Sequence, residues 1–174
     1  ILLTVLMFIL ISSKSYSNDF FCKYFDFTCT KINFSEIKIK NNIFIKNFSS
    51  KPFTGIVFGL VSGKIIEGKS EGYWEIFYET GDLKTKVLFK NGKIDGLKES
   101  FYKNGNLKSV SNYKNDKLNG LNETYHNNQK LKSRTLFKDN LKIRLEEEYY
   151  DNGILKFKGN WVNGVQDGNW DVYD

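Results

Sequence analysis

The chain has 174 residues and a mass of 20.3 kDa, which is enough for one domain or a modest repeat array and excludes two large domains. Aromatic residues make up 16% of the sequence, alanine is absent and proline occurs once, so the composition favours β-structure over helices. The net charge is +6, but the chain after residue 71 is close to neutral. We therefore expect no nucleic-acid surface, because such a surface would concentrate basic residues on one element.

Residues 1–17 begin with an apolar run, Ile1 to Ile11, which only Thr4 interrupts. This run is too short to cross a bilayer as a helix, but its length matches the hydrophobic region of a secretory signal. Ser15-Tyr16-Ser17 follows as a cleavage site with small residues at both ends. We therefore predict a signal peptide over 1–17 and an exported protein, located in the periplasm, on the cell surface or outside the cell. A buried core helix is the alternative interpretation.

Residues 18–50 are interpreted as an N-terminal capping segment that contains both cysteines, Cys22 and Cys29. In an exported protein this pair predicts one disulfide that closes a small loop, whereas without export two free buried thiols are the better interpretation. Alternating apolar and polar residues over 31–47 predict one or two capping strands. Two cysteines and a single histidine cannot complete a four-ligand zinc site, and we expect no metal or other cofactor.

Residues 51–174 are predicted to form a repeat array, and from Gly72 onward the repeat has a period of 24 residues. The blocks are 72–95, 96–119, 120–143 and 144–167, with a fifth opening at 168, and residues 54–66 look like a shortened earlier unit. Three columns recur at fixed positions. The acid column is Glu75, Glu99, Glu123, Glu147 and Asp171, the leucine column is Leu83, Leu107, Leu131 and Leu155, and the lysine column is Lys84, Lys108, Lys132 and Lys156.

Each block contains an aromatic strand, a turn such as Asn104-Gly105, Leu-Lys, a second strand with an aromatic residue, and a turn such as Asn91-Gly92. This pattern resembles the bacterial variant of the MORN (membrane occupation and recognition nexus) repeat, found in proteins often labelled YwqK-family antitoxins. The resemblance implies stacked β-hairpins in an elongated sheet used for binding, and it supplies no catalytic residue. The third block departs from the pattern at Gln129 and Asn140, where glycines are expected, although Asn140 can still adopt a left-handed conformation.

The predicted fold class is all-β, an elongated single antiparallel sheet of stacked β-hairpins. The hairpin register places the acid column beside Lys86, Val110, Arg134 and Lys158, so that charges alternate across most of the strands. On the same face we expect rings to alternate with the lysine column in cation–π contact. The opposite face, with Tyr78, the leucine column and glycines covered by rings such as Phe89, is expected to be apolar. The candidate binding face therefore comprises Phe77, Phe101, Tyr125, Tyr149, Tyr173, Lys84, Lys108, Lys132, Lys156, Glu75, Glu99, Glu123 and Glu147.

His126 occupies a column otherwise filled by Tyr78, Tyr102 and Tyr150, and we interpret it as a packing ring rather than a general base. The columns contain no catalytic constellation, so we expect a protein that is not an enzyme. The leading hypothesis is an exported binding protein whose array contacts another protein or an envelope component. The alternatives are an antitoxin or immunity protein that neutralises a toxin by direct binding, and peripheral membrane contact through lysines and aromatic rings. The oligomeric state stays open.

Overall fold

The computed structural model describes residues 30–173, so the predicted signal peptide over 1–17 and the predicted Cys22–Cys29 disulfide lie outside the described residues. The described residues form β-strands and one short 3-10 helix, and they divide into two compact units between Ser70 and Glu71. No helix in this part of the chain is long and apolar enough to cross a membrane.

The first unit is built from short strands. Its elements are β1 (Lys31–Asn33), the 3-10 helix η2 (Phe34–Glu36), β2 (Ile37–Lys40), β3 (Ile43–Lys46), β4 (Gly55–Phe58) and β5 (Val61–Ile66). β2 and β3 form a separate hairpin, and β4 pairs with β5 as the shortened earlier unit predicted. β1 pairs with β4 in parallel, which departs from the predicted all-antiparallel arrangement, and 31–47 holds three strands instead of one or two. Val57 and Ile65 are fully buried and lie at the centre of this unit's core.

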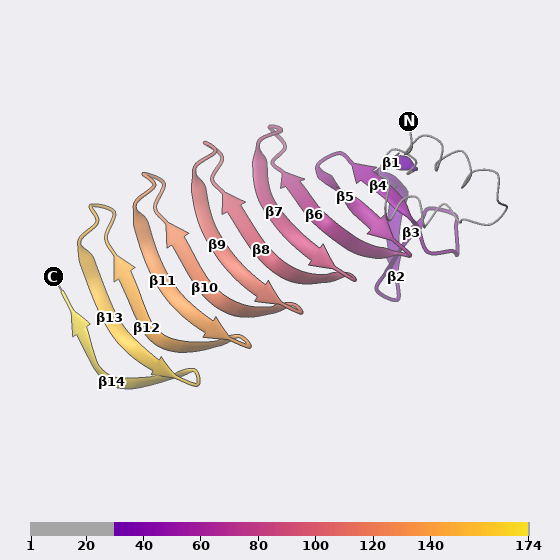
Figure 1. Ribbon diagram of the computed structural model, residues 1–174. Helices are drawn as coiled ribbons and strands as arrows, with labels where there is room; N and C mark the ends of the chain where they lie inside the picture. Colours follow the sequence, from indigo (N-terminus) through magenta and orange to yellow (C-terminus); the bar gives the residue numbers. More distant parts are fainter. Residues whose placement is uncertain (1–29, 174) are drawn as a thin grey trace, which may run out of the picture. The chain divides into compact units, whose positions relative to one another are not determined.

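The second unit is an antiparallel sheet in which the strands lie side by side in chain order (Figure 1). Its strands are β6 (Lys69–Phe77, which belongs to this unit from Glu71 onward), β7 (Leu83–Lys90), β8 (Lys93–Phe101), β9 (Leu107–Lys114), β10 (Lys117–Tyr125), β11 (Leu131–Lys138), β12 (Leu141–Tyr149), β13 (Leu155–Val162) and β14 (Val165–Val172). Two-residue turns such as Asn91-Gly92 alternate with longer loops such as Tyr78–Asp82. The predicted sheet of consecutive hairpins is therefore confirmed.

The acid column forms the predicted row across the middle of this sheet. Glu75 pairs with Lys86, and Lys86 pairs in turn with Glu99 on β8. Val110 lies between Glu99 and Glu123, as the sequence indicated. The row continues by the same register to Asp171 on β14, through Arg134, Glu147 and Lys158. The central register therefore agrees with the alternation of charge that the repeat predicted.

A β-bulge near each long loop places the lysine column on the face of the sheet opposite to the acid column. Phe77 pairs with Leu83, whereas the next pair along the strands is Ile76 with Thr85, so Lys84 is the extra residue on β7. An extra residue on one strand breaks the alternation of side chains between the two faces. The prediction that Lys84 lies beside Phe77 is therefore wrong, and Leu83 takes that position. The same irregularity recurs where β8 meets β9, where β10 meets β11 and where β12 meets β13.

A second irregularity lies near each two-residue turn and explains the recurrent glycine. Phe89 pairs with Gly72 on β6, as expected for a ring that covers a glycine, but on β8 it pairs with Ile94, so it does not cover Gly96, which pairs with Tyr113. Gly96 has φ +134°, and a Cβ placed on it would lie 2.6 Å from Leu88 Cδ2. Only glycine adopts this backbone conformation without strain. Strands of the second unit bend along their length in Figure 1, as bulged strands do.

We predict that Gly96→Val lowers the free energy of unfolding by roughly 2–4 kcal/mol, because it adds backbone strain to a clash with Leu88. Gly81→Val is the matched control, since Gly81 also has a positive φ but no atom within 4 Å of its added Cβ. Gly81→Val should add only backbone strain and no clash, so its urea midpoint should fall less than that of Gly96→Val. Equal midpoints for the two variants would contradict the proposed contact.

Candidate binding surfaces

The first candidate surface is the face that carries the acid column, which we call the ladder face. On it, Arg134 Nε donates to Glu123 Oε1 at 2.8 Å, and the Tyr125 hydroxyl donates to Glu123 Oε2 at 2.9 Å. Lys158 Nζ lies 3.5 Å from Asp171 Oδ2, and Lys86 Nζ lies 4.8 Å from the centre of the exposed Tyr73 ring. Glu123 of the ladder face therefore holds a ring and a cation by hydrogen bonds.

Two tyrosines of the ladder face lie beside an acid of their own strand in successive repeats. Burial raises the pKa of Tyr125, and its hydrogen bond to Glu123 raises it further. Burial also raises the pKa of Tyr149, with Glu147 as the neighbouring charge and hydrogen-bond partner. Both shifts favour the protonated hydroxyl, which is the form that donates a hydrogen bond.

The register also adds the leucine column to the ladder face. Phe77 pairs with Leu83, Phe101 with Leu107, Tyr125 with Leu131 and Tyr149 with Leu155. Directly paired residues in an antiparallel sheet share a face. The ladder face thus presents a ring beside a leucine in each repeat, in place of the predicted ring beside a lysine.

The second candidate surface is the opposite face, which we call the hydroxyl face. It carries a row of five hydroxyl side chains, paired across successive strands from β7 to β11. The row consists of Thr85, Ser100, Ser109, Thr124 and Ser133. Each of these residues is partly exposed. The row begins beside Ile76 on β6 and ends beside Glu148 on β12, so it spans the inner repeats of the array.

The lysine column flanks this row. Lys84 Nζ lies 5.5 Å from the centre of the Tyr78 ring, Lys108 Nζ lies 5.6 Å from that of Tyr102, and Lys156 Nζ lies 5.8 Å from that of Tyr150. Cation–π contacts therefore exist, but with the tyrosines that the sequence placed on the other face. A hollow of about 320 Å³ lies between two of these lysines. It is lined by Tyr78, Lys84, Thr85, Ser100, Phe101, Lys108 and Ser109.

The hydroxyl face is not apolar, which corrects the expectation from the sequence. Its central row runs through Trp74, Val87, Lys98, Ser111, Asn122, Thr135, Glu146 and Gly159. Ser111, Thr135 and Glu146 are buried polar residues in this row. The third position of each block holds Trp74, Lys98, Asn122 and Glu146, which indicates a mixed face, whereas the leucine and glycine columns favour an apolar one.

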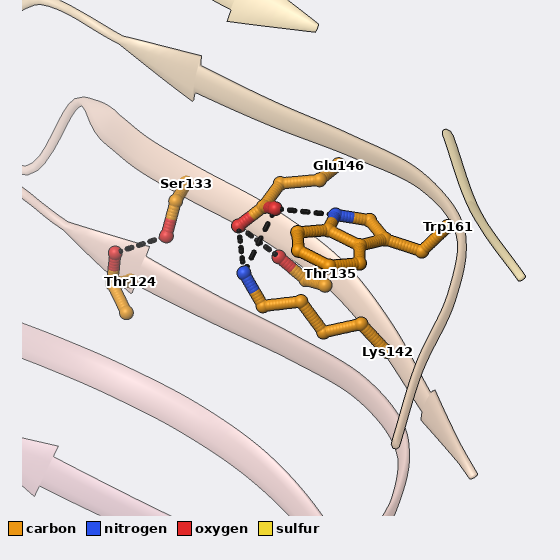
Figure 2. Close-up of polar contacts among 6 residues, drawn as sticks. All are labelled: Thr124, Ser133, Thr135, Lys142, Glu146 and Trp161. Atoms are coloured by element: carbon orange, nitrogen blue, oxygen red, sulfur yellow. Dashed lines mark hydrogen bonds and ion pairs between the residues drawn. The ribbon is translucent and has the colours of Figure 1, made fainter. Parts of the chain in front are cut away.

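Glu146 is the centre of a hydrogen-bond network on this face, drawn in Figure 2. Its Oε1 accepts from Lys142 Nζ at 2.7 Å and from Thr135 Oγ1 at 3.3 Å. Its Oε2 accepts from Lys142 Nζ at 2.8 Å and from Trp161 Nε1 at 2.6 Å. Lys142 Nζ also lies 4.6 Å from the centre of a Trp161 ring. The carboxylate therefore joins three strands, β11, β12 and β13, and is satisfied within the sheet.

His126 occupies a structural position that tyrosines fill elsewhere. The Tyr78 hydroxyl donates to the Phe101 carbonyl and the Tyr102 hydroxyl to the Tyr125 carbonyl, each at 2.8 Å. His126 Nε2 lies 2.9 Å from the Tyr149 carbonyl, so it takes the same place in the third repeat. This bond makes Nε2 the protonated nitrogen, which suits a packing ring. The described residues contain no group of three acidic, histidine or cysteine side chains that could hold a metal ion.

Three segments of the chain, residues 70–91, 94–115 and 145–163, match the MORN repeat variant. No curated protein was found to match the chain. The third block lies outside the three matching segments, and it is the block in which Gln129 and Asn140 replace glycines. Both residues have a positive φ, +67° and +71°, so the turns keep their geometry without glycine. The predicted repeat type is confirmed for the matching segments.

Proposed function

We propose that this chain, which carries MORN-variant repeats, is an exported, non-enzymatic binding protein whose ladder face contacts another protein or an envelope component. The observation that carries this proposal is the recurrence of a ring, a leucine and an acid at the same register in successive repeats. Such a surface offers repeated contacts along the array. Export is supported by the apolar run Ile1 to Ile11 and by Ser15-Tyr16-Ser17, a small-residue pattern typical of a cleavage site.

Tyr125 and Tyr149 are the proposed anchors of this contact. They lie one repeat apart in the array, each beside an acid on its own strand and paired with a leucine across the strand, and Tyr125 also donates a hydrogen bond to its acid. Tyrosines held in this way lose little conformational freedom on binding and contribute strongly to protein interfaces.

We expect the double variant Tyr125→Ala, Tyr149→Ala to lower partner capture about tenfold or more, since each anchor of this kind contributes at least ~1 kcal/mol. Capture is measured by affinity purification from a solubilised envelope fraction of the producing cells, with quantitative mass spectrometry. The matched control is Tyr102→Ala, Tyr150→Ala on the hydroxyl face, which removes the same chemistry. If the control variant loses capture and the first variant keeps it, the assignment of the ladder face is wrong.

Fractionation of the producing cells tests the export part of the proposal. We expect to recover the protein from the periplasm, the cell surface or the medium. Its intact mass should correspond to a chain that begins at Asn18. Full-length protein in the cytoplasm, in complex with a toxin that it inhibits, would replace this proposal with the antitoxin alternative.

A further inference from the structure

We propose that the hydroxyl face binds a linear polysaccharide that carries carboxylates, with the carboxylates on Lys84, Lys108 and Lys132 and the sugar hydroxyls on the row between these lysines. The surface is separate from the ladder face, so this inference goes beyond the protein contact proposed above. It does not depend on that contact.

The lysine-column members of the inner repeats, Lys84, Lys108 and Lys132, have no acid partner in the described part of the chain. Lys84 and Lys108 contact only tyrosine rings, and Lys132 is exposed at the same register position. In the fourth repeat, by contrast, Lys156 Nζ forms an ion pair with Glu148 Oε1 at 3.0 Å. The lysine column therefore gives the hydroxyl face a positive charge over β7 to β11. Beyond β11, Glu148 neutralises the charge of Lys156. An anionic ligand is the partner that this charge distribution favours.

The groups between the lysines match a polyol. Serine and threonine hydroxyls both donate and accept hydrogen bonds, as sugar hydroxyls do. Ser100 and Ser109 line the hollow between Lys84 and Lys108, and its volume of about 320 Å³ leaves room for a sugar ring. Equivalent members of the lysine column are two strands apart, about 9.6 Å in a β-sheet. The distance between these lysines is close to the length of two sugar rings in an extended chain. The carboxylate on every second sugar would therefore meet each lysine in turn.

The same surface fits other polyanions less well. β7 to β11 are inner strands that pair on both sides, so an acidic peptide cannot add to them as a further strand. The rings of Tyr78 and Tyr102 are already covered by lysine ammonium groups, so they are not free platforms for nucleic-acid bases. A polysaccharide needs neither a free strand edge nor a bare ring face.

The test is a calorimetric titration of the full chain with polygalacturonate, with dextran as the neutral polymer. Lys84→Gln, Lys108→Gln should weaken binding at least about tenfold, because each lysine contributes a charged hydrogen bond. The matched control is Lys90→Gln, Lys114→Gln, which removes the same charge from the ends of the same strands, β7 and β9. The control should change affinity less than about twofold, as expected for screened surface charges. Unchanged circular dichroism verifies the fold of each variant, and Lys84→Arg, Lys108→Arg should retain binding.

A second pair of measurements distinguishes recognition of a polysaccharide from attraction of any polyanion. Ser100→Ala, Ser109→Ala should weaken polygalacturonate binding about threefold or more, as loss of a neutral hydrogen bond does. Polyglutamate should bind the wild-type chain more weakly than polygalacturonate. The proposal is overturned by absence of polygalacturonate binding, by equal losses in the two lysine variants, or by polyglutamate binding as tightly. None of these outcomes depends on capture of a protein partner by the ladder face.

Discussion

Glu146→Ala is expected to lower the free energy of unfolding of the repeat array by roughly 2–4 kcal/mol. The change leaves the Lys142 ammonium and the Trp161 indole N–H without their acceptor, in a place where Glu146 itself is 9% exposed. Breaking a buried ion pair by removing one partner usually costs about 3–5 kcal/mol, and we place the expected loss lower because the Lys142 side chain is 33% exposed. Urea unfolding followed by circular dichroism measures the change.

Glu148→Ala is the matched control for Glu146→Ala, because it lies on the same strand and face and pairs with Lys156. The Lys156 side chain is 42% exposed, so we expect Glu148→Ala to lower the free energy of unfolding by less than about 1 kcal/mol. A further variant, Glu146→Met with Lys142→Met, removes both charges and should recover part of the stability. A double variant less stable than Glu146→Ala would show that the network contributes through something other than the unpaired charge.

Trp74→Ala is expected to have the largest effect on stability in the second unit, about 3–5 kcal/mol. Trp74 is 4% exposed and pairs with Val87, which is 3% exposed. Its ring also packs edge-to-face on Phe89, with 5.9 Å between ring centres. Removing the indole therefore opens a cavity beside two apolar neighbours in β7. The measurement is the shift of the urea midpoint, with the slope of the transition checked for a change of mechanism.

Tyr73→Ala is the control for Trp74→Ala, since Tyr73 is the next residue of β6 and is 57% exposed on the other face. It loses only the contact with Lys86, so we expect a change below about 1 kcal/mol. A loss from Tyr73→Ala as large as that from Trp74→Ala would mean that the two faces of β6 are assigned the wrong way round.

Many features of the array could be predicted from the sequence because they are local and repeat. Turn dipeptides such as Asn91-Gly92 mark the hairpins, and the constant period of 24 residues makes the pairing arithmetic the same in each block. The alternation of Glu75, Lys86 and Glu99 then tests the register, since like charges directly opposite each other would repel. Asn140 was expected to tolerate a left-handed turn, and it has φ +71°.

The turn at Asn140 also shows what only the folded chain reveals. Its side chain accepts a hydrogen bond from the Leu118 N–H at 2.7 Å, and Asp116 does the same for the Ile94 N–H at 2.7 Å. These bonds join residues that are 22 positions apart in the sequence. A glycine at either position would supply the turn but not the acceptor.

The order of the hairpins, the row of the acid column and the repeat type follow from the sequence alone. The face on which the lysine column and the leucine column lie, and therefore the composition of both candidate surfaces, follows only from the folded sheet. The reason is that one extra residue on a strand, as at Lys84, reverses the face of the residues beyond it, and nothing in the dipeptide Leu83-Lys84 marks a bulge. The network around Glu146 has a different reason, because its partners Lys142, Thr135 and Trp161 come together only across three paired strands.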